Sequence, residues 1–91
     1  MKTKAILTVL GKDQLGIVAR VATILSDNGC NIEDISQTIM GEIFSMVMLV
    51  TVDKDRVGFN DLQSRLGAIA DEIGVQITLQ QEDVFKYMHR I

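Results

Sequence analysis

The residues best suited to chemistry lie in two short loops that share a pattern. Residues 12–16 read Lys-Asp-Gln-Leu-Gly, and residues 54–58 read Lys-Asp-Arg-Val-Gly. Each loop stands between an apolar run and an amphipathic run, where a strand would pass into a helix. The N–H groups and the dipole at the start of a helix attract negative charge, so either loop could hold an anion. Turns from strand to helix also favour Asp and Gly on conformational grounds alone, and the repeat leaves both interpretations open.

Residue types that support catalysis are scarce. An enzyme needs a nucleophile beside a base, or a cluster of converging ionisable groups. The one cysteine, Cys30, cannot form an internal disulfide or a metal cluster by itself. The one histidine, His89, stands near the end of the chain with no carboxylate or cysteine partner in view. We therefore expect no enzymatic activity, no metal and no cofactor.

Composition points to one small globular domain. The chain has 91 residues, of which 47% are hydrophobic and 23% charged, as expected for a folded protein. Aromatic residues make up only 4% and the net charge is −3. Both values argue against a nucleic-acid partner, which needs aromatic platforms for bases or a surplus of basic residues. No apolar run approaches the ~18 residues of a membrane span and no signal peptide is recognisable, so we expect a cytoplasmic protein without membrane contact.

Hydrophobic periodicity divides the chain into six elements joined by short turns. We expect strands at 4–10, 30–40, 43–52 and 75–80, and helices from 17 to the Asn-Gly pair at 28–29 and from 59 to 73. The apolar residues change parity between Ile32 and Ile35, which predicts a bulge there. Gly41-Glu42 is the expected hairpin turn. The second helix begins either with a capping box of Asn60 and Gln63 or at Gly58.

The resulting order, βαββαβ, predicts an α+β fold of the ferredoxin-like type. In this fold a four-stranded antiparallel sheet carries both helices on one face. Residues 1–82 form the predicted domain. Residues 83–91 form a predicted short C-terminal helix that packs on the domain or on its dimer partner. Its apolar residues are Val84, Phe85, Met88 and Ile91.

The third predicted strand is apolar on both of its faces. Phe44, Met46, Met48 and Val50 alternate with Ile43, Val47 and Leu49. A sheet with helices on one side only should be polar on the other, so something is expected to cover the second face. The cover is either a second subunit or the segment 84–91. A homodimer would also stabilise a core that is marginal in a chain of this size.

The residues from Ile6 to Val18, followed after one helix by Asn-Gly-Cys-Asn-Ile at 28–32, resemble the ACT-domain family. Its local pattern is an acidic or amide residue three positions before a glycine, then a helix, then Asn-Ile at the start of the next strand. The resemblance extends to about Gln80 and is greatest to small stand-alone members similar to glycine-cleavage regulators. It implies a regulatory domain that acts on another chain, because no enzyme is attached to it.

The resemblance also implies a ligand site between the first loop and the start of the second strand, commonly across a subunit interface. The matching residues in this chain are Asp13, Leu15, Gly16, Ile17, Asn31 and Ile32. Helix N–H groups would receive a ligand carboxylate, and Asp13 an ammonium group. Asp13 is equally well explained as an N-cap of the first helix. Serine-binding members resemble one another in a histidine where this chain has Gly11, which argues against serine as the ligand.

These observations predict a domain that binds a small molecule, with an amino acid as the expected class of ligand. It would act allosterically, as a homodimer, on a separate enzyme or regulator. The alternative is a dimerising adaptor that binds a partner protein and no metabolite. The two differ in one measurable property, because only the first is stabilised by a small molecule.

Overall fold

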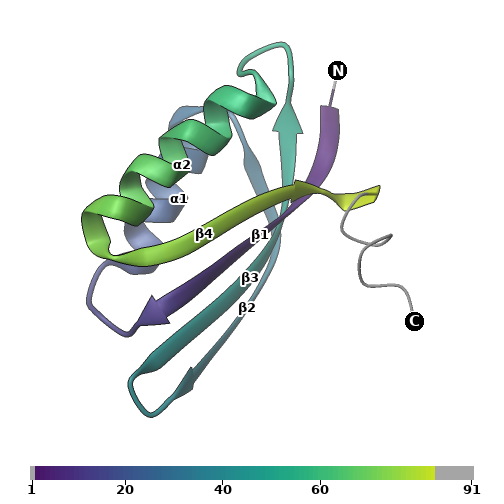
Figure 1. Cartoon of the computed structure of the whole chain (residues 1–91). Coiled ribbons are helices and arrows are strands. Elements are labelled where there is room, and N and C mark those ends of the chain that lie inside the picture. Colours follow the sequence, from purple (N-terminus) through teal and green to yellow (C-terminus); the bar gives the residue numbers. More distant parts are fainter. Residues whose placement is uncertain (1, 84–91) are drawn as a thin grey trace.

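The computed structural model describes residues 2–83, which form four strands and two helices (Figure 1). In chain order they are β1 (Lys2–Lys12), α1 (Ile17–Asp27), β2 (Asn31–Met40), β3 (Ile43–Asp53), α2 (Phe59–Ile73) and β4 (Val75–Gln81). Every element predicted from periodicity is present. The main difference is that β1 begins and ends two residues beyond the predicted strand, because its hydrogen bonding to β3 continues past the apolar run.

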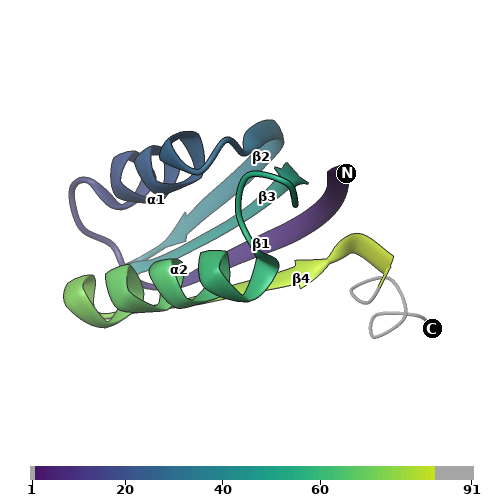
Figure 2. The same cartoon turned by 90° about the horizontal axis from the view of Figure 1, so that it is seen from above.

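The four strands form one antiparallel sheet in the order β2-β3-β1-β4. Both helices lie on the same face of the sheet, with α2 along β4 and α1 along β2 (Figures 1 and 2). The other face, which we call the open face, carries no helix among residues 2–83. The predicted ferredoxin-like arrangement is confirmed. No helix in this part of the chain is long and apolar enough to cross a membrane.

The core lies between the helices and the sheet because side chains alternate along each strand. In β3, Phe44, Met46, Met48, Val50 and Val52 are all buried. They meet the buried alternate residues of β1 and the apolar stripes of the two helices. Those contributions are Ala5, Leu7 and Val9 from β1, Ile17, Val21 and Leu25 from α1, and Leu62, Leu66 and Ala70 from α2.

Most of the predicted turns and irregularities are confirmed. The register between β2 and β3 shifts between Ile32 and Asp34, where the parity of the sequence changes. Gly41 has a φ of 61° in the β2–β3 hairpin, which suits a glycine at a tight turn. The chain continues into helical conformation at Glu82–Asp83 after β4. The rest of the predicted C-terminal helix, residues 84–91, lies outside the described residues.

The two helices begin at glycines, which confirms the Gly58 alternative for α2 and shows that both predicted side-chain caps are wrong. The N-cap of α2 is Gly58, and no side chain makes a capping hydrogen bond there, so Asn60 and Gln63 form no capping box. Gln63 instead donates to the carbonyl oxygen of Leu79 at 2.7 Å. The N-cap of α1 is Gly16, again without a side-chain bond, so Asp13 does not cap that helix. Asp13 stands too far before the first helical residue for its carboxylate to occupy the cap position.

Candidate functional site

The loop between β1 and α1 is anchored by hydrogen bonds from its first two residues. The Asp13 N–H donates to the carbonyl oxygen of Glu42 at 2.7 Å, which ties the loop to the β2–β3 hairpin. The Gln14 side chain donates to the carbonyl oxygen of Ile73 at 2.7 Å, which ties it to the end of α2. Leu15, the residue after these two anchors, is fully exposed. The backbone then turns at Gly16, whose φ of 87° strongly favours glycine.

The N–H groups at the start of α1 have no side-chain hydrogen-bond acceptor. The first N–H groups of a helix lack partners within the helix. No side chain caps α1, and its first turn contains no acidic residue. The positive end of the helix dipole is therefore uncompensated at Ile17 and the two residues after it. An anion placed here would meet free N–H donors.

A hollow of about 320 Å³ lies in front of this helix start. The loop and the first turn of α1 form one wall, and Gln37, Ile39 and Phe44 complete the lining. The site therefore combines N–H donors, the carboxylate of Asp13 and apolar side chains. Sequence reasoning missed Gln37 and Ile39, because their position in the second half of β2 becomes adjacent to the loop only through the β2–β3 register.

The structure brings four of the six predicted site residues together and separates the other two. Asp13, Leu15, Gly16 and Ile17 all line the hollow. Asn31 and Ile32 lie at the opposite end of the sheet, where they pair with Thr51 and Val50. The whole of α1 stands between the two groups, and its 11 residues span about 16 Å. One chain alone does not assemble the predicted site.

Asn31 belongs to a small polar cluster at the start of β2. The carboxylate of Glu33 accepts a hydrogen bond from the Thr51 hydroxyl at 2.7 Å. Hydrogen bonds from Thr51 and then Asn31 lower the pKa of Glu33 below its ordinary value of 4.5, with smaller contributions from Lys4 and Lys2. The charged carboxylate thereby orients the Asn31 side chain at this end of the sheet.

The second loop, 54–58, is not equivalent to the first. The Asp61 carboxylate lies beside Gly58 at the start of α2, with Oδ2 3.3 Å from where a Cβ on Gly58 would be. An acidic residue in the first turn already supplies the negative charge that this helix end favours. Arg56 extends away from that helix start and packs against Gly29. The matching sequence pattern therefore serves local packing here, and only the first loop leaves its helix start open.

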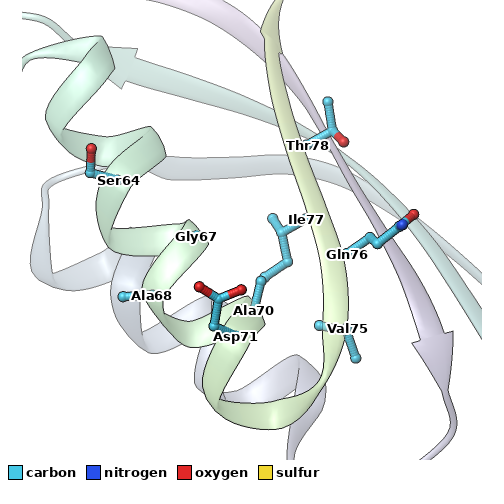
Figure 3. Close-up of a pocket in the computed structure, with 9 residues that line it drawn as sticks. All are labelled: Ser64, Gly67, Ala68, Ala70, Asp71, Val75, Gln76, Ile77 and Thr78. Atoms are coloured by element: carbon cyan, nitrogen blue, oxygen red, sulfur yellow. The ribbon is translucent and has the colours of Figure 1, made fainter.

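A larger hollow lies elsewhere, in a groove between α2 and the outer edge of β4 (Figure 3). Its volume is about 830 Å³. On the α2 side it is lined by the small residues Ser64, Gly67 and Ala68, whose side chains fill little of the groove. Asp71 is its one charged lining residue, and no basic side chain lines it. The donor side chains in this groove, Ser64, Gln76 and Thr78, are all neutral, and Asp71 would repel a ligand carboxylate. The smaller hollow at α1 adds the uncapped N–H groups of a helix start and is therefore the better candidate for an amino acid.

A row of isoleucines on β2 lies exposed beside α1. Ile32, Ile35 and Ile39 pair with Val50, Met48 and Phe44, which are buried under the helices. Opposite residues in an antiparallel pair share a face, so the three isoleucines also lie on the helix side. Yet they are 36%, 40% and 56% exposed, because α1 does not reach over this edge of the sheet. We call these three residues the isoleucine ledge.

The described residues contain no group of three or more metal-ligating side chains. Cys30 is half-buried, and burial raises the pKa of its thiol. A thiol that remains protonated is a poor nucleophile and a poor metal ligand. Cys30 therefore adds no chemistry to the site.

Comparison with known proteins places these features in a family. Residues 3–80 match the model of an ACT domain family. The chain is 46% identical to a UPF0237 protein of Methanocaldococcus jannaschii over 98% of this chain and 99% of that one. The structure of an ACT domain protein from Streptococcus pneumoniae aligns over 92% of this chain and 94% of that chain, with a TM-score of 0.79 and 38% identity. A structure described as a glycine cleavage system transcriptional repressor shares the fold at a TM-score of 0.79 and 20% identity, over 89% of this chain and 46% of that chain.

Proposed function

Because this chain belongs to the ACT domain family, we propose that it is a non-catalytic regulatory domain that binds an amino acid and acts on a separate protein. ACT domains in general bind small molecules and regulate. The observation that carries the proposal is the open start of α1. Its first turn lines a hollow that also contains one carboxylate, two amides and several apolar side chains.

The chemistry of the hollow suits the two charged ends of an amino acid. The N–H groups of the first turn of α1 would bind the carboxylate, with help from the helix dipole. Asp13 would accept hydrogen bonds from the ammonium group, which are stronger than neutral ones because both partners are charged. Ile39 and Phe44 would contact an apolar side chain of the ligand. An amino acid satisfies all three parts of the site, whereas a simple inorganic anion leaves Asp13 facing like charge.

The separation of Asn31 from the loop supports a site shared between two subunits. A two-fold axis beside the middle of α1 and β2 would place these elements antiparallel to their copies in the partner subunit. The start of β2 in one protomer would then lie next to the end of β2 in the other, and the same would hold for α1. Asn31 and Ile32 of the partner subunit would then close the hollow at Asp13. The same contact would bury the isoleucine ledge of both protomers, which otherwise meets water. We propose this arrangement for the homodimer.

Thermal unfolding of the purified protein in the presence of each of the twenty amino acids tests the proposal. A ligand at a hundredfold excess over its Kd adds about 2.7 kcal/mol to the free energy of unfolding. One amino acid should therefore raise the Tm in a concentration-dependent way. Stabilisation by none of them would favour the alternative of a ligand-free adaptor, whose protein partner would then be sought by pull-down.

A mixing experiment tests whether the site is shared. Asp13→Ala and Asn31→Ala homodimers should each bind the ligand more weakly, by about 10-fold or more, since a hydrogen bond to a charged group contributes about 1.5–3 kcal/mol. Unfolding and refolding the two variants together produces mixed dimers. In a mixed dimer one site loses both residues and the other recovers both, so high-affinity binding should return in part. A site contained within one chain would show no recovery.

A further inference from the structure

The open face of the sheet carries an apolar surface that nothing among residues 2–83 covers. Met40, Ile43, Val47 and Leu10 are 69%, 52%, 40% and 46% exposed. Ile6 and Leu49 oppose each other across β1 and β3. Together with Val47 and the β2 residues Asp34, Ile35 and Ser36 they line a hollow of about 130 Å³. This surface lies on the other side of the sheet from the isoleucine ledge and the ligand loop, so the proposed dimer contact does not bury it.

The chain has a segment of suitable composition directly after β4. Residues 84–91 read Val-Phe-Lys-Tyr-Met-His-Arg-Ile and contain two of the four aromatic residues of the protein. Apolar residues at 84, 85, 88 and 91 are spaced to form one stripe on a helix. Helical conformation already begins at Glu82–Asp83. The acidic residues at that start and the basic residue at 90, in the last turn, suit the helix dipole.

The position where β4 ends brings this segment to the apolar surface. Gln81, the last residue of β4, pairs with Ala5, which is next to Ile6 in β1. Figure 1 shows the end of β4 beside the beginning of β1. Neighbouring strands are ~4.8 Å apart, so the column of Leu49 and Val47 in β3 lies about 10 Å from β4. Eight helical residues span about 12 Å, which is enough to cross β1 and β3.

We propose that residues 84–91 form a helix that lies across the open face of its own chain and fills the hollow between Ile6, Val47 and Leu49. Met88, in the middle of the apolar stripe, is the residue placed over the hollow, and Arg90 lies toward Asp34 at its far rim. The segment has basic residues and no acidic one, which complements the Asp34 carboxylate. A flexible thioether adapts readily to a shallow hollow of this kind.

The proposal assigns the two apolar surfaces of the chain to different occupants. The tail covers the open face, and the second copy covers the isoleucine ledge. A dimer formed through the two open faces would require residues 84–91 of both protomers to be displaced from those faces. The inference stands independently of any ligand, since it concerns the face of the sheet opposite the α1 hollow.

Disulfide trapping tests the placement. In a Cys30→Ala background, Val47→Cys and Met88→Cys place one thiol on the open face and one on the tail. Mild oxidation at low protein concentration should give a cross-link within one chain, seen as a faster band on non-reducing electrophoresis. The matched control pairs Met88→Cys with Ser64→Cys on the helix side and should give no such band. Cross-linking only between chains, or equal trapping of both pairs, would overturn the proposal.

A second experiment does not depend on engineered disulfides. Val47→Lys should lower the Tm of the full chain by several degrees, because it places a charge under the tail. In a chain ending at Asp83 the same substitution should change the Tm little, since Val47 then faces water. The truncated chain should also bind a hydrophobic dye several-fold more strongly than the full chain. An equal effect of Val47→Lys in both chains, or unchanged dye binding, would show that the tail lies elsewhere.

Discussion

Gly11 and Val75 face each other across β1 and β4 with no room for a side chain between them. A Cβ on Gly11 would lie 2.7 Å from Cγ1 of Val75 and 2.9 Å from its Cβ. Packing therefore requires glycine at this position. The histidine that serine-binding relatives are expected to carry here would displace Val75, which is buried in the core.

Gly11→Ala is expected to destabilise the fold by about 1–3 kcal/mol, the usual cost of overpacking a close contact. Val75→Ala removes the Cγ1 contact but keeps the Cβ at 2.9 Å. It should therefore relieve the clash in part, and the double variant should be somewhat more stable than the sum of the two single effects predicts. Urea unfolding of the four proteins measures the coupling free energy. If the free-energy changes of the two substitutions simply add, the Val75 side chain does not contribute to the cost of Gly11→Ala.

Gly67→Ala is expected to raise the free energy of unfolding. Gly67 lies in the interior of α2, and a Cβ there would meet no atom within 4 Å. Alanine favours a helix by about 0.8–1 kcal/mol over glycine, so the variant should unfold at a higher urea concentration. Gly67 also lines the groove beside β4. A loss of stability would indicate that this groove is occupied in the native protein by a group that a methyl displaces.

Glu33 should make stability depend on pH in the acidic range. Its folded-state pKa is lowered by hydrogen bonds from Thr51 and Asn31, so the folded chain binds fewer protons than the unfolded chain. Its contribution is complete above the ordinary value of 4.5 and is lost as the pH falls through the lowered pKa. The stability difference between the wild type and Glu33→Gln should therefore shrink below that pH. Urea midpoints at several pH values measure it, and a constant difference would contradict the assignment.

Much of the fold follows from local patterns in the chain. The alternation in β3, the apolar spacing of the helices and the glycines at the turns each specify one element. The parity change between Ile32 and Ile35 even located the bulge, because shifting a strand by one residue moves every side chain to the other face. These features depend only on neighbours along the chain, which is why they could be predicted.

The candidate site was harder to predict, because it depends on distances between elements. Asp13 and Asn31 stand on either side of one helix in the sequence, which suggests proximity. That helix instead separates them by its full length. Gln37 and Ile39 join the loop only through strand pairing. Asp13 was also given a capping role that Gly16 fills, since residue type alone does not reveal where a helix begins.

Ile35→Lys is expected to dissociate the proposed dimer without unfolding the chain. Ile35 is 40% exposed in the middle of the isoleucine ledge, so a lysine there can reach water in a single protomer and should change its stability by no more than about 0.5 kcal/mol. In the dimer the two-fold axis would bring two such lysines close together in an apolar contact, where neither has a partner. Sedimentation velocity should show the dimer Kd rising at least ~100-fold.

Gln76→Lys is the matched control for this change. Gln76 is exposed on β4, at the far edge of the sheet from the ledge, and the same added charge there should leave the dimer intact. If the proposed ligand site draws on both protomers, Ile35→Lys should also abolish ligand-induced stabilisation, although Ile35 is not among the residues that line the α1 hollow. A variant that stays dimeric, or a monomer that still binds the ligand with full affinity, would show that the subunits do not meet along α1 and β2.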